Sequence, residues 1–167
     1  MTPPLRPEDQ ARVLIDEQLT QAGWHVCDRQ DIDLVNQYAN AVREVVMDAG
    51  HGRADYLLYV DKRVVGVIEA KPSGTTLSGV QWQSAMYAAG LPEAYRETAV
   101  LKDDRLPFVF EASGTETHYT NGFDPNPRAR KIFNFPQPET LARITREAEA
   151  NPDAPTWRSR VHNMPPY

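Results

Sequence analysis

The segment from residue 53 to residue 71, RADYLLYVDKRVVGVIEAK, constrains the possible fold of this chain more than any other. It contains two runs of strand-forming residues that flank residues 61–63, and both runs are apolar on both faces. Strands of this kind lie in the middle of a sheet that is covered on both sides. The segment therefore predicts a central β-hairpin with a three-residue turn at 61–63, in which Leu58 pairs with Gly66.

Charged residues stand at the open end of this hairpin. The expected register places Asp55 opposite Glu69, and Lys71 projects to the same side as Glu69 because side chains alternate along a strand. Two carboxylates and one ammonium then converge, which is what a metal-dependent phosphodiester hydrolase requires. The carboxylates hold a divalent cation that activates water, and the lysine orients the nucleophile or stabilises the transition state.

A structural ion pair is the alternative for these three residues. Charges at the end of a buried strand are costly unless they are paired or bind a metal, so Lys71 could simply neutralise Asp55 or Glu69. The segment that follows favours a site. Residues 78–90 run from a Thr/Ser-rich loop to a glycine and predict a helix. Gln83 and Tyr87 lie four residues apart and share a face of it, although Tyr87 on that face could also be a core residue.

The combination of these motifs resembles the PD-(D/E)xK nucleases of the RecB-like branch. More closely, it is similar to the N-terminal nuclease domain of type I restriction enzyme R subunits, over roughly residues 5 to 145. The motifs that carry the resemblance are Gly23-Trp24, Asp55, Glu69-x-Lys71, Gln83-x-x-x-Tyr87 and Pro127-Arg128. One departure is visible, because Ala54 stands where the superfamily name has proline.

The resemblance implies a Mg²⁺-dependent DNA endonuclease, a type I site-specific deoxyribonuclease. Asp55, Glu69 and Lys71 would be catalytic. The metal ligands would be Asp55, Glu69 and the Ala70 carbonyl oxygen. Gln83 and Tyr87 would support the site or contact the DNA backbone.

Two further acidic residues are candidates for the same site. Glu8 corresponds in position to an acidic residue that helps to bind metal in some relatives, but a favourable charge in the first turn of a helix explains it equally well. Glu44 alternates with Val42 and Val46 on an expected strand and could point toward the site. A solvated strand face explains Glu44 about as well.

The order of expected elements indicates an α/β restriction-endonuclease-like core, with a central mixed sheet flanked by helices. Residues 1–150 are expected to form the endonuclease domain. Residues 151–167 are rich in proline and have the composition of a linker, which would lead to a motor domain absent from this chain. The expected elements are a helix at 7–22, strands at 24–27 and 41–47, the central hairpin, the helix at 78–90, a second hairpin over 108–120 and a helix at 139–150.

Composition constrains the setting of this domain. The chain has one cysteine, no apolar run near the ~20 residues of a membrane span and no signal peptide, so we expect a cytoplasmic protein with no membrane partner. Its 23 acidic and 18 basic residues give a net charge of −5, which is unusual for a protein that binds DNA unaided.

Double-stranded DNA would therefore be delivered by other parts of an assembly. No P-loop motif is present, so ATP would serve only the motor domain. The methylation and specificity subunits would be partners through the rest of the R subunit. Two alternatives remain open: a nuclease fold kept as a non-catalytic docking module, and a stand-alone repair or junction nuclease.

Overall fold

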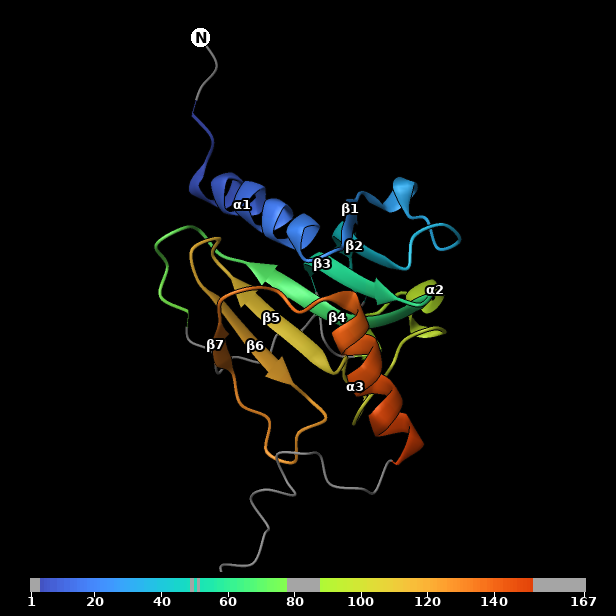
Figure 1. Ribbon diagram of the computed structural model, residues 1–167. Helices are drawn as coiled ribbons and strands as arrows, with labels where there is room; N and C mark the ends of the chain where they lie inside the picture. Colours follow the sequence, from blue (N-terminus) through green and yellow to red (C-terminus); the bar gives the residue numbers. More distant parts are fainter. Residues whose placement is uncertain (1–3, 49, 51, 78–87, 152–167) are drawn as a thin grey trace, which may run out of the picture.

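The computed structural model describes residues 4–48, 50, 52–77 and 88–151, which are arranged around a seven-stranded sheet (Figure 1). The helices and strands are α1 (Pro7–Gln21), β1 (His25–Cys27), η1 (Arg29–Asp31), β2 (Ala39–Val46), β3 (Arg53–Val60), β4 (Arg63–Ala70), η3 (Ala88–Gly90), α2 (Glu93–Arg96), β5 (Phe108–Ala112), β6 (Thr117–Asn121), β7 (Arg130–Ile132) and α3 (Pro138–Ala150). Among these described helices, none is long and apolar enough to cross a membrane.

The strands lie in the sheet in the same order as in the chain, from β1 to β7. The pairs β1–β2 and β4–β5 are parallel, and the remaining neighbours are antiparallel. The hairpin β3–β4 is therefore central, as its apolar residues predict, and most of its side chains are buried. The α/β class with a mixed sheet is confirmed, and this architecture is compatible with a restriction-endonuclease-like core.

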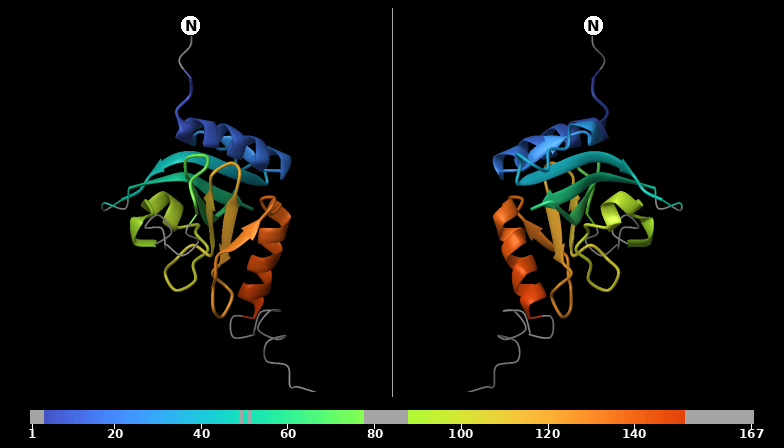
Figure 2. Two further views of the ribbon diagram at one scale, coloured as in Figure 1. Left: turned by 90° about the vertical axis from the view of Figure 1, so that its left-hand side faces the viewer. Right: turned by 90° about the vertical axis from the view of Figure 1, so that its right-hand side faces the viewer.

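Helices cover the sheet from two sides, and Figure 2 shows α2 and α3 on opposite sides of it. One core lies under α1 and α3, where Ile15 and Leu141 pack with Tyr56, Ile68 and Phe110. The second core contains the directly paired residues Leu57, Val67 and Val109, together with Leu91 and Leu106 from the segment before β5. Side chains alternate along β3, so Tyr56, Leu58 and Val60 belong to the first core and Leu57 and Tyr59 to the second.

The turn of the central hairpin differs from the prediction. Val60 pairs with Arg63, so the turn has two residues, Asp61 and Lys62, and both have positive φ angles (50° and 67°). This is the geometry of a type I′ turn. Val65 is an extra residue on β4 and forms a β-bulge, which restores the expected register. Leu58 therefore still pairs with Gly66.

Several predictions from the sequence fall on residues outside the described ones. Gln83 and Tyr87 lie in residues 78–87, and most of the expected linker lies in residues 152–167. The final helix, expected at 139–150, is α3 at Pro138–Ala150. The division into a domain at 1–150 and a linker at 151–167 stays a prediction.

Candidate functional site

The strands β3 and β4 stop pairing at Asp55. The last backbone pair is Tyr56 with Ile68, and beyond it the Ala70 N–H donates a hydrogen bond to Asp55 Oδ2 at 2.8 Å. On its other side β4 continues to pair with β5 through Ala70, and the Lys71 N–H bonds the Ala112 carbonyl at 2.7 Å. The Asp55 carboxylate thus replaces a backbone carbonyl of β3 as the acceptor for the Ala70 N–H. This contact lies at the end of the hairpin where the site is expected.

Glu69 and Lys71 form an ion pair at this end of β4. Lys71 Nζ lies 2.8 Å from Glu69 Oε1, and both side chains are about one-third exposed. The hydrogen bond to Glu69 raises the pKa of Lys71, and this effect, with the charges of Glu69, Glu111 and Asp55, outweighs the opposing cost of burial. Lys71 is therefore a protonated cation at neutral pH, in contact with Glu69 and influenced by the charges of Glu111 and Asp55 on the two neighbouring strands.

Glu111 belongs to this group, although the sequence analysis did not single it out. It pairs directly with Glu69 across the parallel strands β4 and β5, so the two side chains lie on the same face. Glu111 is only 8% exposed. A single acid within the apolar run FVFEA was the signal that could have identified it, because a charge in a buried strand is costly without a partner.

Arg12 is the second residue that sequence reasoning missed. It reaches from α1 to the end of the sheet, where its guanidinium forms ion pairs with Asp55 and Glu44. Asp55 and Arg12 are 16% and 24% exposed, so water only partly screens this pair. No signal in the sequence could have identified Arg12, since its partners Glu44 and Asp55 lie 32 and 43 residues further along the chain.

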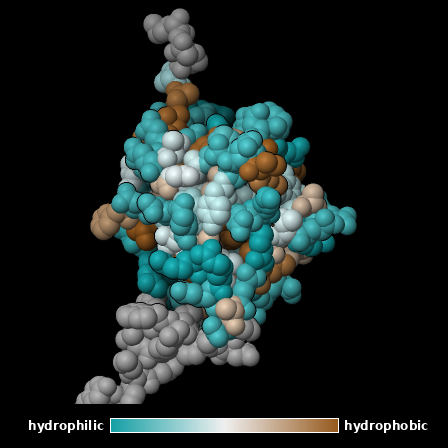
Figure 3. Space-filling view, turned by 45° about the vertical axis from the view of Figure 1, so that its right-hand side comes forward, coloured by the Kyte–Doolittle hydropathy of each residue, from teal (hydrophilic) through white to brown (hydrophobic). Residues whose placement is uncertain are grey.

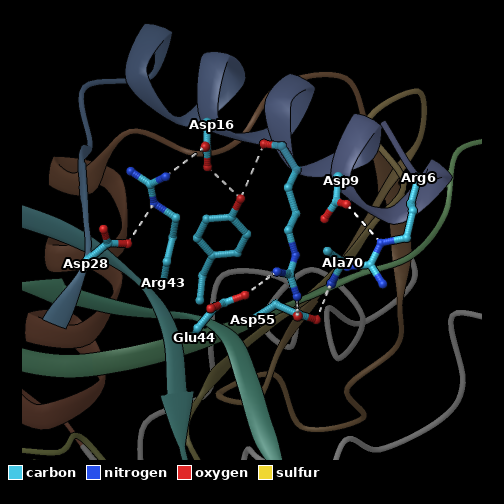
Figure 4. Close-up of polar contacts among 10 residues, drawn as sticks. Arg6, Asp9, Asp16, Asp28, Arg43, Glu44, Asp55 and Ala70 are labelled. Carbon is cyan, nitrogen blue, oxygen red and sulfur yellow. Dashed lines mark hydrogen bonds and ion pairs between the residues drawn. The ribbon is translucent and has the colours of Figure 1, made fainter. Parts of the chain in front are cut away.

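Polar contacts fix α1 over β2 and β3 and so determine where Arg12 can reach (Figure 4). The buried Tyr56 hydroxyl donates to Asp16 Oδ1 at 2.6 Å, and Asp16 also pairs with Arg43 of β2 at 3.4 Å. Arg43 in turn lies 3.6 Å from Asp28. Burial, followed by the bond to Asp16, raises the pKa of Tyr56, so the hydroxyl stays a donor.

The structure treats the two additional acidic candidates differently. Glu44 has a positive φ of 54° and meets Arg12, which connects it to Asp55. Glu8 is exposed in the first turn of α1 and, among the described residues, its side chain makes no hydrogen bond or ion pair. Arg12 therefore links Glu44 to Asp55, which is hydrogen-bonded to the end of β4 that carries the Glu69–Lys71 ion pair, whereas Glu8 takes no part in these contacts.

Cationic side chains already pair with carboxylates in this group, Arg12 with Asp55 and Glu44 and Lys71 with Glu69. In the part of the chain that the structure describes, no three His, Cys, Asp or Glu residues are grouped closely enough to hold a metal ion by themselves. Asp55 and Glu69 nevertheless offer the hard oxygen donors that Mg²⁺ prefers, and Mg²⁺ commonly needs only one or two protein carboxylates besides its waters. The donor set therefore fits a magnesium ion that is bound partly by water.

In a comparison with known families, residues 34–124 match the type I restriction enzyme EcoKI endonuclease subunit second domain. No curated protein sequence and no solved structure matches the chain. The matched segment runs from the loop before β2 to the loop after β6, so it contains the β3–β4 hairpin and Glu111 but not Arg12. It covers more than half of the 167 residues. The chain therefore belongs to this family of type I restriction enzyme endonuclease-subunit domains, and its role is nuclease-related.

Proposed function

We propose that the chain is a Mg²⁺-dependent DNA endonuclease domain of the PD-(D/E)xK type, which hydrolyses phosphodiester bonds as part of a type I restriction enzyme R subunit. The observation that carries the proposal is the end of the β3–β4 hairpin, where the strands part. Asp55, Glu69 and Lys71 lie there on two central strands of a domain whose family is a restriction endonuclease subunit.

Asp55 and Glu69 are the proposed metal ligands, with the Ala70 carbonyl oxygen as a third donor. The hydrogen bond from Ala70 N–H holds the Asp55 carboxylate beside β4. Because the side chain is already ordered, Asp55 would lose less conformational entropy on binding a cation. A bound Mg²⁺ would activate water and offset the negative charge of the phosphate.

Lys71 is the proposed electrostatic partner of the reacting phosphate. Its ammonium stays protonated beside Glu69, so it donates hydrogen bonds rather than accepting a proton. Gln83 and Tyr87, outside the described residues, remain proposed contacts to the DNA backbone or supports for the carboxylates. Glu44 is a proposed indirect support through Arg12.

The proposed setting follows from the family and the charge of the chain. A motor domain that consumes ATP, reached through the linker proposed at 151–167, would bring double-stranded DNA to this domain in the cytoplasm. Methylation and specificity subunits would supply target recognition. The net charge of −5 supports this dependence, because few positive charges are available for the DNA backbone.

The test is a plasmid cleavage assay on the assembled restriction complex carrying Asp55→Asn. We expect cleavage to fall by about a hundredfold or more, because several kcal/mol of transition-state stabilisation depend on the bound cation. Asp61→Asn is the matched control. It makes the same change at the other end of the same hairpin, in a turn position with φ of 50° that asparagine tolerates.

The assay also separates the proposal from a docking module that has kept only the fold. Ion pairs already neutralise Asp55 and Glu69, as they would in a purely structural network. Equal cleavage by the Asp55→Asn and Asp61→Asn complexes would favour that reading. Cleavage by the isolated chain at the rate of the complex would favour a stand-alone nuclease.

A further inference from the structure

The guanidinium of Arg12 occupies the position of a counter-cation at the carboxylate end of the hairpin. It pairs with Asp55 Oδ1 and with Glu44, which come from the neighbouring strands β3 and β2. The other Asp55 oxygen already accepts the Ala70 amide. Each oxygen of Asp55 therefore has a partner within the protein.

The position of Arg12 is determined by the fold and does not depend on a flexible surface contact. Arg12 lies between the buried residues Ala11 and Ile15 on α1, and its carbonyl oxygen lies 3.4 Å from the Tyr56 hydroxyl oxygen. The single proton of this hydroxyl is donated to Asp16, one turn further along the helix, at 2.6 Å (Figure 4). The helix therefore holds the guanidinium over the paired strands β2 and β3, near the point where β3 and β4 part.

The bonding capacity of Arg12 is not filled by these partners. Its Nε is buried and, among the described residues, has no hydrogen-bond partner. A guanidinium has five N–H donors, and an unpaired buried donor has a free-energy cost. A permanent structural ion pair is most stable when every N–H group of the guanidinium has an acceptor. An arginine that changes partners leaves an N–H group without an acceptor in one of its two positions.

We propose that Arg12 is a positioning residue that holds Asp55 in the metal-free domain and is displaced from Asp55 when a divalent cation binds. This inference rests on the proposed function of the site. A guanidinium and a divalent cation on one partly buried carboxylate repel each other, so binding of the metal and pairing of Arg12 with Asp55 oppose one another. By linkage, each weakens the other to the same extent.

The experiment measures Mg²⁺ binding by the chain without DNA, by calorimetry and by the rise in melting temperature over a Mg²⁺ series that starts from EDTA. We expect Arg12→Gln to bind Mg²⁺ about tenfold more tightly than the unsubstituted chain. In EDTA the same variant should melt at a lower temperature, because Asp55 and Glu44 then lack their cation. Mg²⁺ should raise its melting temperature by a larger amount.

Arg6→Gln is the matched control. Arg6 is the residue before α1, and its side chain is 80% exposed. Among the described residues, this side chain forms an ion pair with the nearby Asp9 alone. The Arg6→Gln substitution removes the same charge from the same end of the molecule, but it removes no contact of Asp55 or Glu44. Arg12→Lys is the second variant, because it keeps the charge but cannot bridge two carboxylates with a planar fork. Its Mg²⁺ affinity should lie between those of the other two chains.

The outcomes separate this inference from the proposed function. If Mg²⁺ binds and Asp55→Asn abolishes binding, but Arg12→Gln binds no more tightly than Arg6→Gln, the metal site stands and the role of Arg12 is refuted. If no chain binds Mg²⁺, both proposals fail. Tighter binding by Arg12→Gln that is lost again in the Arg12→Gln, Asp55→Asn double variant supports both.

Discussion

Lys71 balances two carboxylates that would otherwise face each other across neighbouring strands. Glu69 and Glu111 are directly paired on β4 and β5, and like charges in this arrangement are destabilising. Lys71 Nζ lies 2.8 Å from Glu69 Oε1, and the negative charge of Glu111 also helps to raise the pKa of Lys71. At the scale of single residues, its charge serves both the stability of the sheet and the proposed chemistry.

Lys71→Met should therefore have two effects. DNA cleavage by the assembled complex should be abolished, and the free energy of unfolding should fall by roughly 1 kcal/mol or less, since the ion pair is partly exposed. Adding Glu111→Gln should recover part of the stability but none of the cleavage. Urea unfolding and plasmid cleavage are the measurements, with the exposed Lys102→Met as the control. Normal cleavage by a folded Lys71→Met complex would show that the lysine is not catalytic.

The parts of the candidate site that the sequence predicted are those set by local spacing. Glu69 and Lys71 lie two residues apart on one strand, and a tight hairpin brings Asp55 beside them. Arg12 and Glu111 could not be placed in this way, because they reach the site through α1 and through a parallel crossover. Their positions depend on how distant elements pack.

At the scale of elements, the pairing of Leu58 with Gly66 was predicted correctly although the turn was not, and the backbone pairing ends at Tyr56 and Ile68, one position before the expected pair of Asp55 with Glu69. The expected three-residue turn is a two-residue turn, and the bulge at Val65 supplies the compensating residue. Asp61-Lys62 lacks the glycine that usually marks a type I′ turn, so a two-residue turn could not be predicted from these residues. The strand β7, at Arg130–Ile132, was also missed because it lies in a segment rich in proline.

The first helix illustrates the limit of periodicity. Its bounds were predicted closely, but its apolar residues are not all buried, since Val13 and Leu14 are 46% and 37% exposed. The buried stripe is Ala11, Ile15 and Leu19, which are spaced by four residues. Apolar residues fall on two sides of this helix, so only its packing partner decides which side is buried.

Gly66 is the residue on which the close approach of β4 to β5 depends. A Cβ atom at this position would lie 2.5 Å from the backbone carbonyl oxygen of Phe108, which cannot move without shifting β5. Gly66→Ala should lower the free energy of unfolding by roughly 1–3 kcal/mol, as expected for overpacking. Urea denaturation would measure it, with the exposed Val46→Ala on β2 as a control. A change below that of the control would contradict this account of β4–β5 packing.

At the scale of the whole molecule, the surface has little attraction for a polyanion. The chain carries a net charge of −5, and the face shown in Figure 3 is mostly hydrophilic with small scattered apolar areas. The proposed site itself contributes acidic groups, which a bound cation would offset only in part. The proposed nuclease domain would therefore depend on its neighbours to hold DNA.

The isolated chain should therefore bind duplex DNA weakly and without sequence preference. A dissociation constant of about 10⁻⁴ to 10⁻⁶ M, or weaker, is expected at physiological salt. The measurement is a salt series of DNA binding with Ca²⁺ in place of Mg²⁺. Tight and sequence-selective binding under these conditions would contradict the delivered-substrate proposal and support the stand-alone nuclease.

The agreement between strand order in the sheet and strand order in the chain has a consequence for synthesis. Each new strand is added at an existing edge, and none has to be inserted between two others. A chain emerging from the ribosome can thus extend its sheet from β1 toward β7 as it is made. Asp55 and Glu69 would meet while the segment that carries Glu111 is still being translated, so the carboxylate end of the hairpin would be assembled in stages.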